Sequence, residues 1–384
     1  MYNVHLLNKI AKCGTDKFDP ANYKTVEDIN EADAVMVRSA AMHDIEFDPK
    51  LQAIARAGAG VNNIPVDACA EKGIVVFNTP GANANGVKEL AVAALLLASR
   101  DIVGGISWAG TLTENVAKSV EKGKSAFAGC ELKGKTLGVI GLGAIGGMVA
   151  NAAQALGMNV IGCDPFMTVK AAWNLSSGVK QAATYEDIYK KADYISLHVP
   201  STPDTKGMIN IETIAQMKDG VKIINLARAD LVNSTDLKTA LGSGKVSKYV
   251  TDFPTEETIN VPGIVAIPHL GASTGESEDN CAIMGAEQLV DYLENGNITN
   301  SVNYPAISMP RSGDARLVVL HKNQPDVLSR ITTVLAADGV NIENMASRSK
   351  GNFACALLDC ISPATDKYIA DIEAIEGVIR VLVK

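Results

Sequence analysis

The chain has neither a paired-cysteine motif nor a long apolar run, and these two absences narrow its class. Seven cysteines are scattered along 384 residues, with no C-x-x-C pair and no spacing typical of metal ligands. We therefore expect buried, reduced cysteines and no bound metal. The longest apolar stretch, 90–98, is too short to cross a bilayer, and the first residues lack the pattern of a signal peptide. Both observations favour a cytoplasmic protein with no membrane partner.

A basic excess is also missing. The formal net charge of −8 argues against a surface that binds nucleic acid. The composition is otherwise that of an ordinary globular protein, with 47% hydrophobic and 20% charged residues. A chain of 384 residues is long enough for two or three domains.

A glycine-rich turn is the strongest positive signal. An apolar run at 137–140 leads into G-L-G-A-I-G at 141–146, which matches the pattern G-x-G-x-x-G. A helix-forming stretch follows, and a second apolar run at 158–163 is closed by Asp164. This β-turn-α-β unit predicts a bound dinucleotide, with the pyrophosphate at the helix N-terminus and the ribose diol on the carboxylate.

The glycines have separate tasks in such a turn. Gly141 permits the tight turn, Gly143 leaves room for the phosphates, and Gly146 lets the helix pack close to the strand. The free N–H groups near Ala144 and Ile145 then attract the anion.

Asp164 distinguishes NAD from NADP, and a dinucleotide site from a turn without a ligand. Its carboxylate would repel a 2′-phosphate, so NAD is favoured over NADP. The alternative is a glycine-rich turn without a ligand, but nothing structural requires an acid at this place.

Strand-like and helical segments alternate along the first 300 residues. The first hundred residues predict strands at 34–38 and 73–78 and a short strand near 51–56, and residues 101–131 predict a helix and a crossing arm. A doubly wound parallel α/β sheet is predicted from six further strands, at 137–141, 158–163, 194–199, 222–226, 248–252 and 264–267.

The pattern changes near residue 300. Residues 278–295 predict one long helix, and prolines, serines and a glycine at 301–313 predict a linker. The remaining segments follow the order βαββαβ of a small ferredoxin-like module, at 317–321, 327–337, 340–348, 354–361, 366–375 and 378–383.

Three chemically complementary residues follow strands of the predicted sheet. Arg228 comes after the strand at 222–226, Glu257 after that at 248–252, and His269 after that at 264–267. Ligands of open α/β sheets bind outside the carboxyl ends of the strands, so all three are expected near the cofactor. An arginine can grip a carboxylate, a histidine can take a hydroxyl proton, and a carboxylate can hold the imidazole.

Over nearly its whole length the chain resembles a known family, the D-isomer-specific 2-hydroxyacid dehydrogenases. The similar segments are VRSA (37–40), RAGAGVNNI (56–64), NTP (78–80), GLGAIG (141–146), CDP (163–165), LHVPSTPDTKGMIN (197–210), NLAR (225–228), residues 252–257 and PHLGAST (268–274).

The resemblance implies specific roles. Arg228 would orient the substrate, His269 would be the acid/base and Glu257 its partner. The positions that would surround NAD, besides the glycine turn and Asp164, are His198, Val199, Pro200, Leu226, Ala227, Asp252, Gly271 and Ala272.

A phosphorylated substrate would need further cations. Arg38 ends a predicted strand, and Arg56 precedes a glycine-rich loop whose amides can bind an oxyanion. The resemblance implies that Arg38, Ser39, Arg56, Ala59 and Gly60 bind the substrate, and that Lys124 matches a cationic position of a neighbouring subunit. Each cation alone is equally compatible with an ordinary surface charge, but together they favour a phosphorylated 2-hydroxy acid over lactate.

The C-terminal module resembles an ACT domain, a small amino-acid-sensing unit. In relatives, positions matching His321, Asn323 and Asn341 bind serine between paired modules. Asp326 stands where that family usually has glycine, and its carboxylate would crowd the site and repel the carboxylate of serine. Weak or absent serine inhibition is therefore expected, and a module used only for dimerisation is the alternative.

The resemblance implies three domains. These are a discontinuous flavodoxin-like substrate domain (1–95 and 280–305), a Rossmann-like NAD domain (96–279) and, after a linker (306–313), an ACT-like module (314–384). The implied activity is NAD-dependent oxidation of D-3-phosphoglycerate to 3-phosphohydroxypyruvate, the entry to serine synthesis, by a homodimer or homotetramer. The alternatives are oxidation of another D-2-hydroxy acid, such as glycerate or lactate, and a non-enzymatic corepressor that senses NAD.

Overall fold

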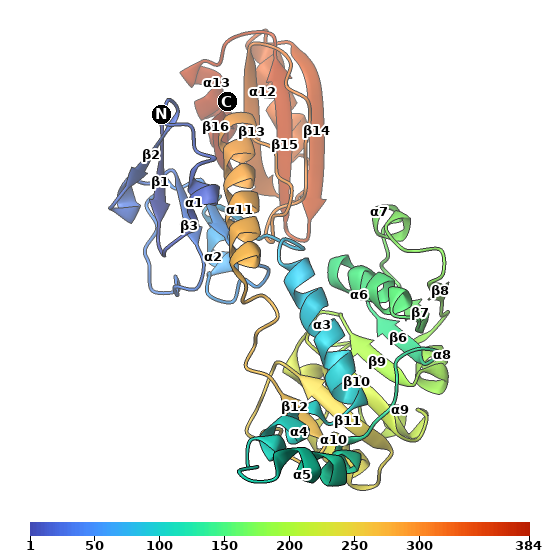
Figure 1. The fold of residues 1–384 in the computed structure, drawn as a ribbon. Helices are drawn as coiled ribbons and strands as arrows, with labels where there is room; N and C mark the ends of the chain where they lie inside the picture. Colours follow the sequence, from blue (N-terminus) through green and yellow to red (C-terminus); the bar gives the residue numbers. More distant parts are fainter. The chain divides into compact units, whose positions relative to one another are not determined.

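The chain folds into two compact units. The computed structural model describes residues 1–384 apart from the side chain of Lys170. Unit 1 comprises Met1–Asn83 and Glu278–Lys384, and unit 2 comprises Ala84–Ser277. Figure 1 traces the elements of each.

Unit 1 contains a parallel sheet in the order β2-β1-β3-β4-β5, which is the flavodoxin-like order. The central strand β3 is buried at every position, as expected of a parallel strand covered on both faces. The strands are β1 (Tyr2–Leu6), β2 (Tyr23–Val26), β3 (Ala34–Val37), β4 (Ala53–Arg56) and β5 (Val75–Phe77). Its helical segments are α1 (Lys12–Thr15), η1 (Ile29–Glu31), α2 (Val66–Glu71) and most of α11 (Gly275–Asn295).

The C-terminal part of unit 1 is an antiparallel sheet in the order β14-β15-β13-β16. With its two helices it has the βαββαβ order expected from the sequence. The elements are β13 (Ala315–Lys322), α12 (Val327–Ala337), β14 (Ile342–Lys350), β15 (Phe353–Cys360), α13 (Asp366–Glu373) and β16 (Val378–Val383).

This C-terminal sheet shares one hydrophobic core with the parallel sheet of unit 1. Val318 and Leu357 of the C-terminal sheet belong to the same buried cluster as Val4 of β1 and Tyr292 of α11. Figure 1 shows α11 running beside both. The connection between them is packed as well, since Ile307 and Met309 are each only 5% exposed.

A buried ion pair joins the connection to the C-terminal sheet. Arg316 of β13 and Asp359 of β15 are both fully buried, with Nε and Oδ1 2.6 Å apart. Arg316 also donates to the carbonyls of Met309, Pro310 and Asn295. The guanidinium of Arg316 therefore binds backbone oxygens of the connection and of α11, and this holds the start of β13 in place.

Unit 2 is a seven-stranded parallel sheet in the order β12-β11-β10-β9-β6-β7-β8. It contains the six predicted strands and one more, β8 (Lys180–Gln181), which has two residues and escapes detection by pattern. The other strands are β6 (Thr136–Ile140), β7 (Asn159–Cys163), β9 (Tyr194–Leu197), β10 (Val221–Asn225), β11 (Val246–Thr251) and β12 (Ile264–Ala266).

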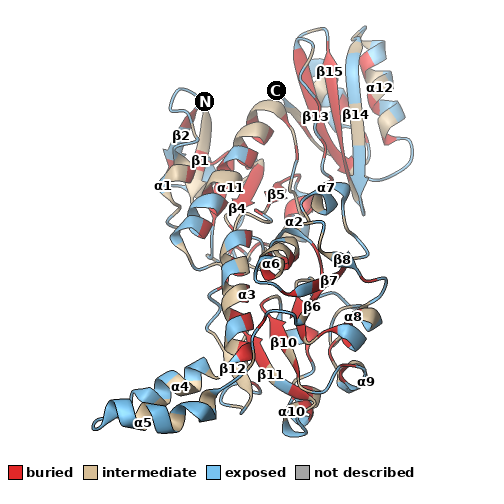
Figure 2. Cartoon of the chain, turned by 45° about the vertical axis from the view of Figure 1, so that its right-hand side comes forward, coloured by how far each residue is buried: buried red, intermediate tan, exposed pale blue. Residues whose placement is uncertain are grey.

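Helices cover both faces of this sheet, as in a doubly wound fold. The apolar faces of α3 (Ala84–Ser99) and α6 (Ala144–Ala155) form one core with β6 and β11. On the other face α8 (Tyr185–Lys191), α9 (Ile211–Ala215) and α10 (Ser234–Gly242) form a second core. A short helix, α7 (Val169–Trp173), and a 3-10 turn, η3 (Ala229–Leu231), complete the set. The central strands are almost wholly buried (Figure 2).

The predicted arm at 101–131 consists of two short helices and a turn. They are α4 (Ile102–Ala109), α5 (Val116–Gly123) and η2 (Lys124–Phe127), and none of the three has a buried residue. Figure 2 shows α4 and α5 largely in the colour of exposed residues. Within the described part of the chain no single helix is long and apolar enough to span a membrane, and only the bent pair α3–α4 passes that test jointly.

Candidate active site

The glycine turn lies where β6 ends and α6 begins, and two of its glycines are required by the fold. Gly141 has φ of 90°, and a Cβ there would lie 2.6 Å from the carbonyl oxygen of His198. A Cβ on Gly146 would lie 1.9 Å from the carbonyl oxygen of Gly141. Side chains at these positions would therefore clash with backbone rather than with movable side chains.

Gly143 is different, because the fold itself does not require it. It is the N-cap of α6 with φ of −66°, and a Cβ there would meet nothing within 4 Å. No side chain caps the helix, so the N–H groups of Ala144 and Ile145 have no capping acceptor. Open space in front of an uncapped helix N-terminus fits a pyrophosphate.

Asp164 lies directly after β7, with its carboxylate fixed against this turn. Oδ2 accepts a hydrogen bond from the N–H of Leu142 at 2.9 Å, and Oδ1 accepts one from the N–H of Phe166 at 2.9 Å. Each oxygen keeps a lone pair for another donor. The donor set therefore fits a ribose diol beside the pyrophosphate.

β9 ends beside β6, at the point where the strand order reverses. His198, Val199 and Pro200 follow β9 there, and a Cβ on Gly141 would also meet Val199, at 2.9 Å. The chain packed around the imidazole lowers the pKa of His198 to about 4, so its ring is neutral at neutral pH. Nε2 lies 2.8 Å from the hydroxyl of Ser196.

Asp252 is a buried carboxylate with an unsatisfied oxygen. It is 1% exposed, Oδ2 accepts from the N–H of Gly271 at 3.1 Å, and Oδ1 has no partner. Burial raises its pKa, while the N–H of Gly271 and the nearby His269 and Arg228 oppose the rise. An orphaned buried acceptor fits a ligand donor such as the carboxamide of a nicotinamide. Leu226 and Ala227 follow the neighbouring β10, and Ala272 follows Gly271.

Arg228 and His269 are brought together by a residue that sequence reasoning missed. The ring of Phe253 lies 4.6 Å from that of His269 between centroids, and 5.8 Å from the guanidinium carbon of Arg228. These three residues follow β10, β11 and β12, which are neighbours in the sheet. The only signal in the sequence was the position of Phe253 directly after a predicted strand.

Glu257 lies in the exposed turn that follows, at 256–260. The turn is closed by hydrogen bonds between Thr255 and Thr258, at 2.9 Å from N–H to hydroxyl and 3.1 Å between hydroxyls. Among the described side chains, no hydrogen bond joins Glu257 to His269. The structure thus places Glu257 at the same end of the sheet without forming the expected pair.

In unit 1, Arg38 and Ser39 follow β3 and are held by a residue not singled out from the sequence. The N–H groups of Arg38, Ser39 and Ala40 donate to Oδ1 of Asn8, at 3.2, 3.1 and 3.0 Å. The guanidinium of Arg38 also pairs with Glu278 at 2.5 Å. This cation therefore already has a carboxylate partner.

Arg56 ends β4, and its side chain reaches the same region of unit 1. Nε donates to the carbonyl of Arg38 at 3.1 Å, and burial, reinforced by the charge of Arg38, lowers its pKa. Ala59 is exposed, and its carbonyl accepts from Asn78 at 2.7 Å. Gly60 follows it in the loop.

Lys124 lies in η2 of unit 2 and pairs with Glu121 at 2.5 Å. Both side chains are largely exposed. Like Arg38, this cation has an acidic partner within the chain.

The predicted effector residues are only partly brought together. His321 and Asn323 line a hollow of about 580 Å³ beside Asp326, Ser347 and Arg348, whereas Asn341 is not among its lining residues. His321 is 3% exposed, burial lowers its pKa, and its Nε2 has no partner.

Asp326 has a left-handed backbone conformation, which favours glycine. Its φ is 72°, in the left-handed region, which costs about 1 kcal/mol for a residue with a Cβ. The carboxylate accepts a hydrogen bond from the hydroxyl of Ser329 in the first turn of α12. The hollow therefore contains a negative charge beside His321 and Asn323.

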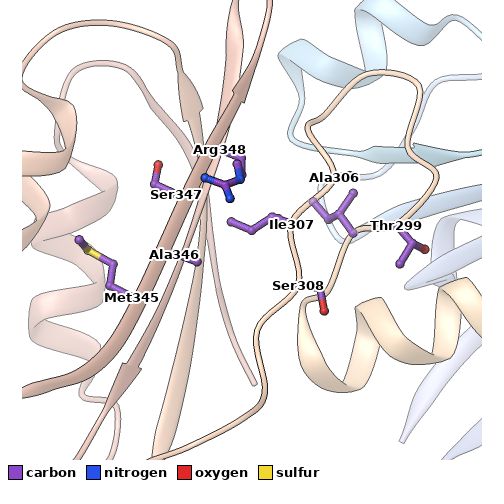
Figure 3. Close-up of a pocket in the computed structure, with 9 residues that line it drawn as sticks. Thr299, Ala306, Ile307, Ser308, Met345, Ala346, Ser347 and Arg348 are labelled. Carbon is purple, nitrogen blue, oxygen red and sulfur yellow. The ribbon is translucent and has the colours of Figure 1, made fainter. Parts of the chain in front are cut away.

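A second hollow of about 580 Å³ lies between β14 and the segment 298–308. Figure 3 shows Ile307 and Arg348 facing one another across it. Arg348 is its only charged lining residue, so it contains no acid–base pair. Among the described residues no cluster of His, Cys, Asp and Glu could hold a metal ion, and all seven cysteines are free.

Comparison with known proteins agrees with this geometry. Residues 93–271 match the model of the D-isomer specific 2-hydroxyacid dehydrogenase, NAD binding domain. A solved NAD+-bound 3-phosphoglycerate dehydrogenase of Entamoeba histolytica is similar with a TM-score of 0.61 and 29% identity, over 79% of this chain and 98% of that one. The glycine turn and Asp164 thus lie in an NAD-binding domain.

Two relatives show how far the likeness extends. The D-3-phosphoglycerate dehydrogenase of Methanocaldococcus jannaschii is 38% identical over 77% of this chain, but the chain spans only 56% of that protein. The D-3-phosphoglycerate dehydrogenase of Haemophilus influenzae is 31% identical over 88% of this chain and 82% of its own length. With likeness over most of both chains, the protein belongs to the D-isomer-specific 2-hydroxyacid dehydrogenase family.

Proposed function

We propose that the protein oxidises D-3-phosphoglycerate to 3-phosphohydroxypyruvate with NAD. One observation carries the proposal. Arg228 and His269 both contact the ring of Phe253 at neighbouring strand ends, in the domain that contains the glycine turn. A carboxylate anchor and a proton acceptor are the two groups that oxidation of a 2-hydroxy acid requires.

Arg228, His269 and Glu257 have separate roles in the proposed reaction. Arg228 holds the substrate carboxylate and polarises the carbonyl as it forms. An imidazole nitrogen of His269 takes the hydroxyl proton. Glu257 stabilises the resulting imidazolium, and the absence of a hydrogen bond here is compatible with that role because such bonds are often long in ligand-free proteins.

When bound, NAD supplies the acceptor for the hydride that leaves the substrate carbon. The N–H groups of Ala144 and Ile145 would hold its pyrophosphate, Asp164 its adenosine ribose, and Asp252 its carboxamide. The backbone around His198 and Leu226 would border the rings. The neutral ring of His198 would add no charge beside the nicotinamide.

Arg38 and Arg56, with Ser39 and the amides of Ala59 and Gly60, would bind the phosphate, and Lys124 of a neighbouring subunit would add a further cation. A second candidate, a D-2-hydroxy acid without phosphate, is favoured by one observation. Arg38 and Lys124 are already paired with Glu278 and Glu121, so their charges are partly neutralised.

A substrate panel tests both candidates. NADH oxidation is measured with phosphohydroxypyruvate, hydroxypyruvate and pyruvate. The proposal expects the highest kcat/KM for the phosphorylated acid, and an Arg56→Gln variant should narrow the difference. Equal kcat/KM for hydroxypyruvate would favour the second candidate, and no turnover of any member would refute both.

A histidine variant tests the assignment of the acid/base. His269→Gln should lower kcat by a factor on the order of 100 or more, since acid–base catalysis contributes about 10²–10⁴-fold. His5→Gln, a change in β1 of unit 1, is the matched control and should leave turnover unchanged. Near-normal turnover of His269→Gln would exclude this role.

We also propose that the protein forms a homodimer or homotetramer. Helix α4 presents Ile102, Val103 and Ile106 to solvent, exposed by 39%, 46% and 69%. A second copy would remove this apolar surface from water. Light scattering coupled to gel filtration should give a multiple of 40.3 kDa, and a monomer at micromolar concentration would refute this.

A further inference from the structure

Phe253 contacts both Arg228 and His269, the two groups of the proposed mechanism. Its backbone N–H donates to the hydroxyl of Thr251 at 3.1 Å, directly after β11. Pro254 follows and restricts Phe253 to an extended backbone. The ring is tilted by 44° against the imidazole of His269. A single rigid side chain thus contacts residues from the two flanking strand ends.

Neither Arg228 nor His269 has side-chain tethers that would fix it alone. The guanidinium of Arg228 makes one hydrogen bond, to the carbonyl of Ala227 at 2.7 Å. Arg228 itself is exposed. The imidazole of His269 makes none to any described residue, although its backbone, with φ of 38°, is held by the carbonyls of Asp252 and Ile267. The N–H of Arg228 in turn donates to Oδ1 of Asn225 at 3.4 Å, so the backbones of both residues are held. The ring of Phe253 is a contact that their side chains share.

The structure assigns to Phe253 the role of a positioning residue, which orients the imidazole of His269 and the guanidinium of Arg228 for the reaction. This inference rests on the proposed function. An aromatic ring suits the task because its face attracts both a guanidinium and an imidazolium, and its two torsions leave little freedom. An aliphatic side chain would fill the same space without attracting either cation.

The test compares Phe253→Leu, Phe253→Tyr and Phe18→Leu in the full-length protein. Phe18 is the matched control, since it forms an aromatic pair with Tyr23 in unit 1 at 5.4 Å and 44°. We expect Phe253→Leu to lower kcat about tenfold and to raise KM for the hydroxy acid about threefold, as aromatic and cation–π contacts of this size imply. Phe253→Tyr should keep kcat/KM within about threefold, because it keeps the ring, and Phe18→Leu should leave kcat and KM unchanged.

A readout independent of turnover comes from the histidine ring protons. The native protein and the variants are labelled at histidine, and the His269 resonances are identified by their loss in His269→Gln. Phe253→Leu should broaden or split these resonances because the imidazole then takes up more than one direction, whereas loss of the ring current alone would leave a single sharp, shifted line. Phe18→Leu should leave the resonances unchanged. The melting temperature of each variant shows that it is folded.

The outcomes separate this inference from the proposed function. Native kcat, KM and His269 resonances in a folded Phe253→Leu would overturn the positioning role, and so would a Phe253→Tyr variant as slow as Phe253→Leu. Failure of the native protein to turn over any hydroxy acid would refute the proposed function. In that event the resonances alone decide: broadened or split His269 resonances in Phe253→Leu support the orientation by Phe253, and a single sharp line overturns it.

Discussion

Replacing single glycines of the 141–146 turn should separate cofactor binding from folding. In Gly146→Ala the new methyl group would lie 1.9 Å from the carbonyl oxygen of Gly141, so either β6 or α6 must move. Overpacking against backbone costs about 1–3 kcal/mol. The variant should therefore lose both stability and NAD affinity.

Gly143→Ala should behave differently, although it lies three residues earlier. Its φ of −66° suits alanine, and a Cβ meets nothing within 4 Å. The gain from a less flexible unfolded chain and the loss of a glycine N-cap nearly cancel, so stability should change by less than about 0.5 kcal/mol.

The same methyl group would occupy the space proposed for the pyrophosphate. Losing one charge-assisted hydrogen bond there costs about 1.5–3 kcal/mol, which corresponds to NAD binding that is roughly 10–140 times weaker. Gly147→Ala is the matched control, because its Cβ would make only an ordinary contact, 3.5 Å from Leu175.

Calorimetric titration with NADH gives Kd, and circular dichroism melting gives stability. The reasoning would be refuted if Gly143→Ala bound NADH as tightly as the native protein. A Gly146→Ala variant as stable as the native one would equally contradict the steric argument.

Three further results are expected. Because packing around the ring lowers the pKa of His198 from 6.5 to about 4, the unfolded chain takes up its proton first, so stability is greatest above pH 6.5 and falls toward pH 4. The free energy of unfolding should fall by about 3 kcal/mol over that window. Urea unfolding at pH 7 and pH 5 should show a smaller fall in His198→Asn than in the native protein, and equal falls would exclude this cause. Arg316→Met should destabilise the protein by about 3–5 kcal/mol, because it leaves the carboxylate of Asp359 buried without its partner. In urea unfolding, the double variant with Asp359→Leu should recover much of the lost stability. No recovery would count against an effect of charge. Calorimetry should detect no micromolar binding of serine to the native protein but measurable binding to Asp326→Gly, and tight binding to the native protein would defeat the expected effect of the carboxylate.

Much of the fold could be predicted because local patterns carry it. The strands at 137–141 and 378–383 differ from β6 and β16 by at most one residue, since long apolar runs bounded by glycine or polar residues have one strong interpretation. β1 and β2 were not predicted, because their mixed polar and apolar residues show little regular pattern. β8 was missed because two residues have no period at all.

The candidate site was predictable only as separate strand ends. Arg228, Glu257 and His269 could be placed after successive strands because parallel strands end at one edge of a sheet. Phe253 could not be assigned, since its contacts depend on the tilt of a ring and on the left-handed backbone of His269. The three hydrogen bonds that Asn8 accepts after β3 could not be predicted either, because Asn8 lies in a loop thirty positions before Arg38.

The core that the C-terminal sheet shares with the parallel sheet of unit 1 determines how this part of the protein unfolds. Tyr292 and Tyr304 are fully buried in that core, with ring contacts to Phe77 of β5 and Phe353 of β15. Neither sheet can open without exposing side chains of the other, so the two behave as one foldon. The slowest-exchanging amides of β1 and β13 should therefore exchange with the same opening free energy, and a chain cut after residue 313 should expose the apolar side of α11 and aggregate.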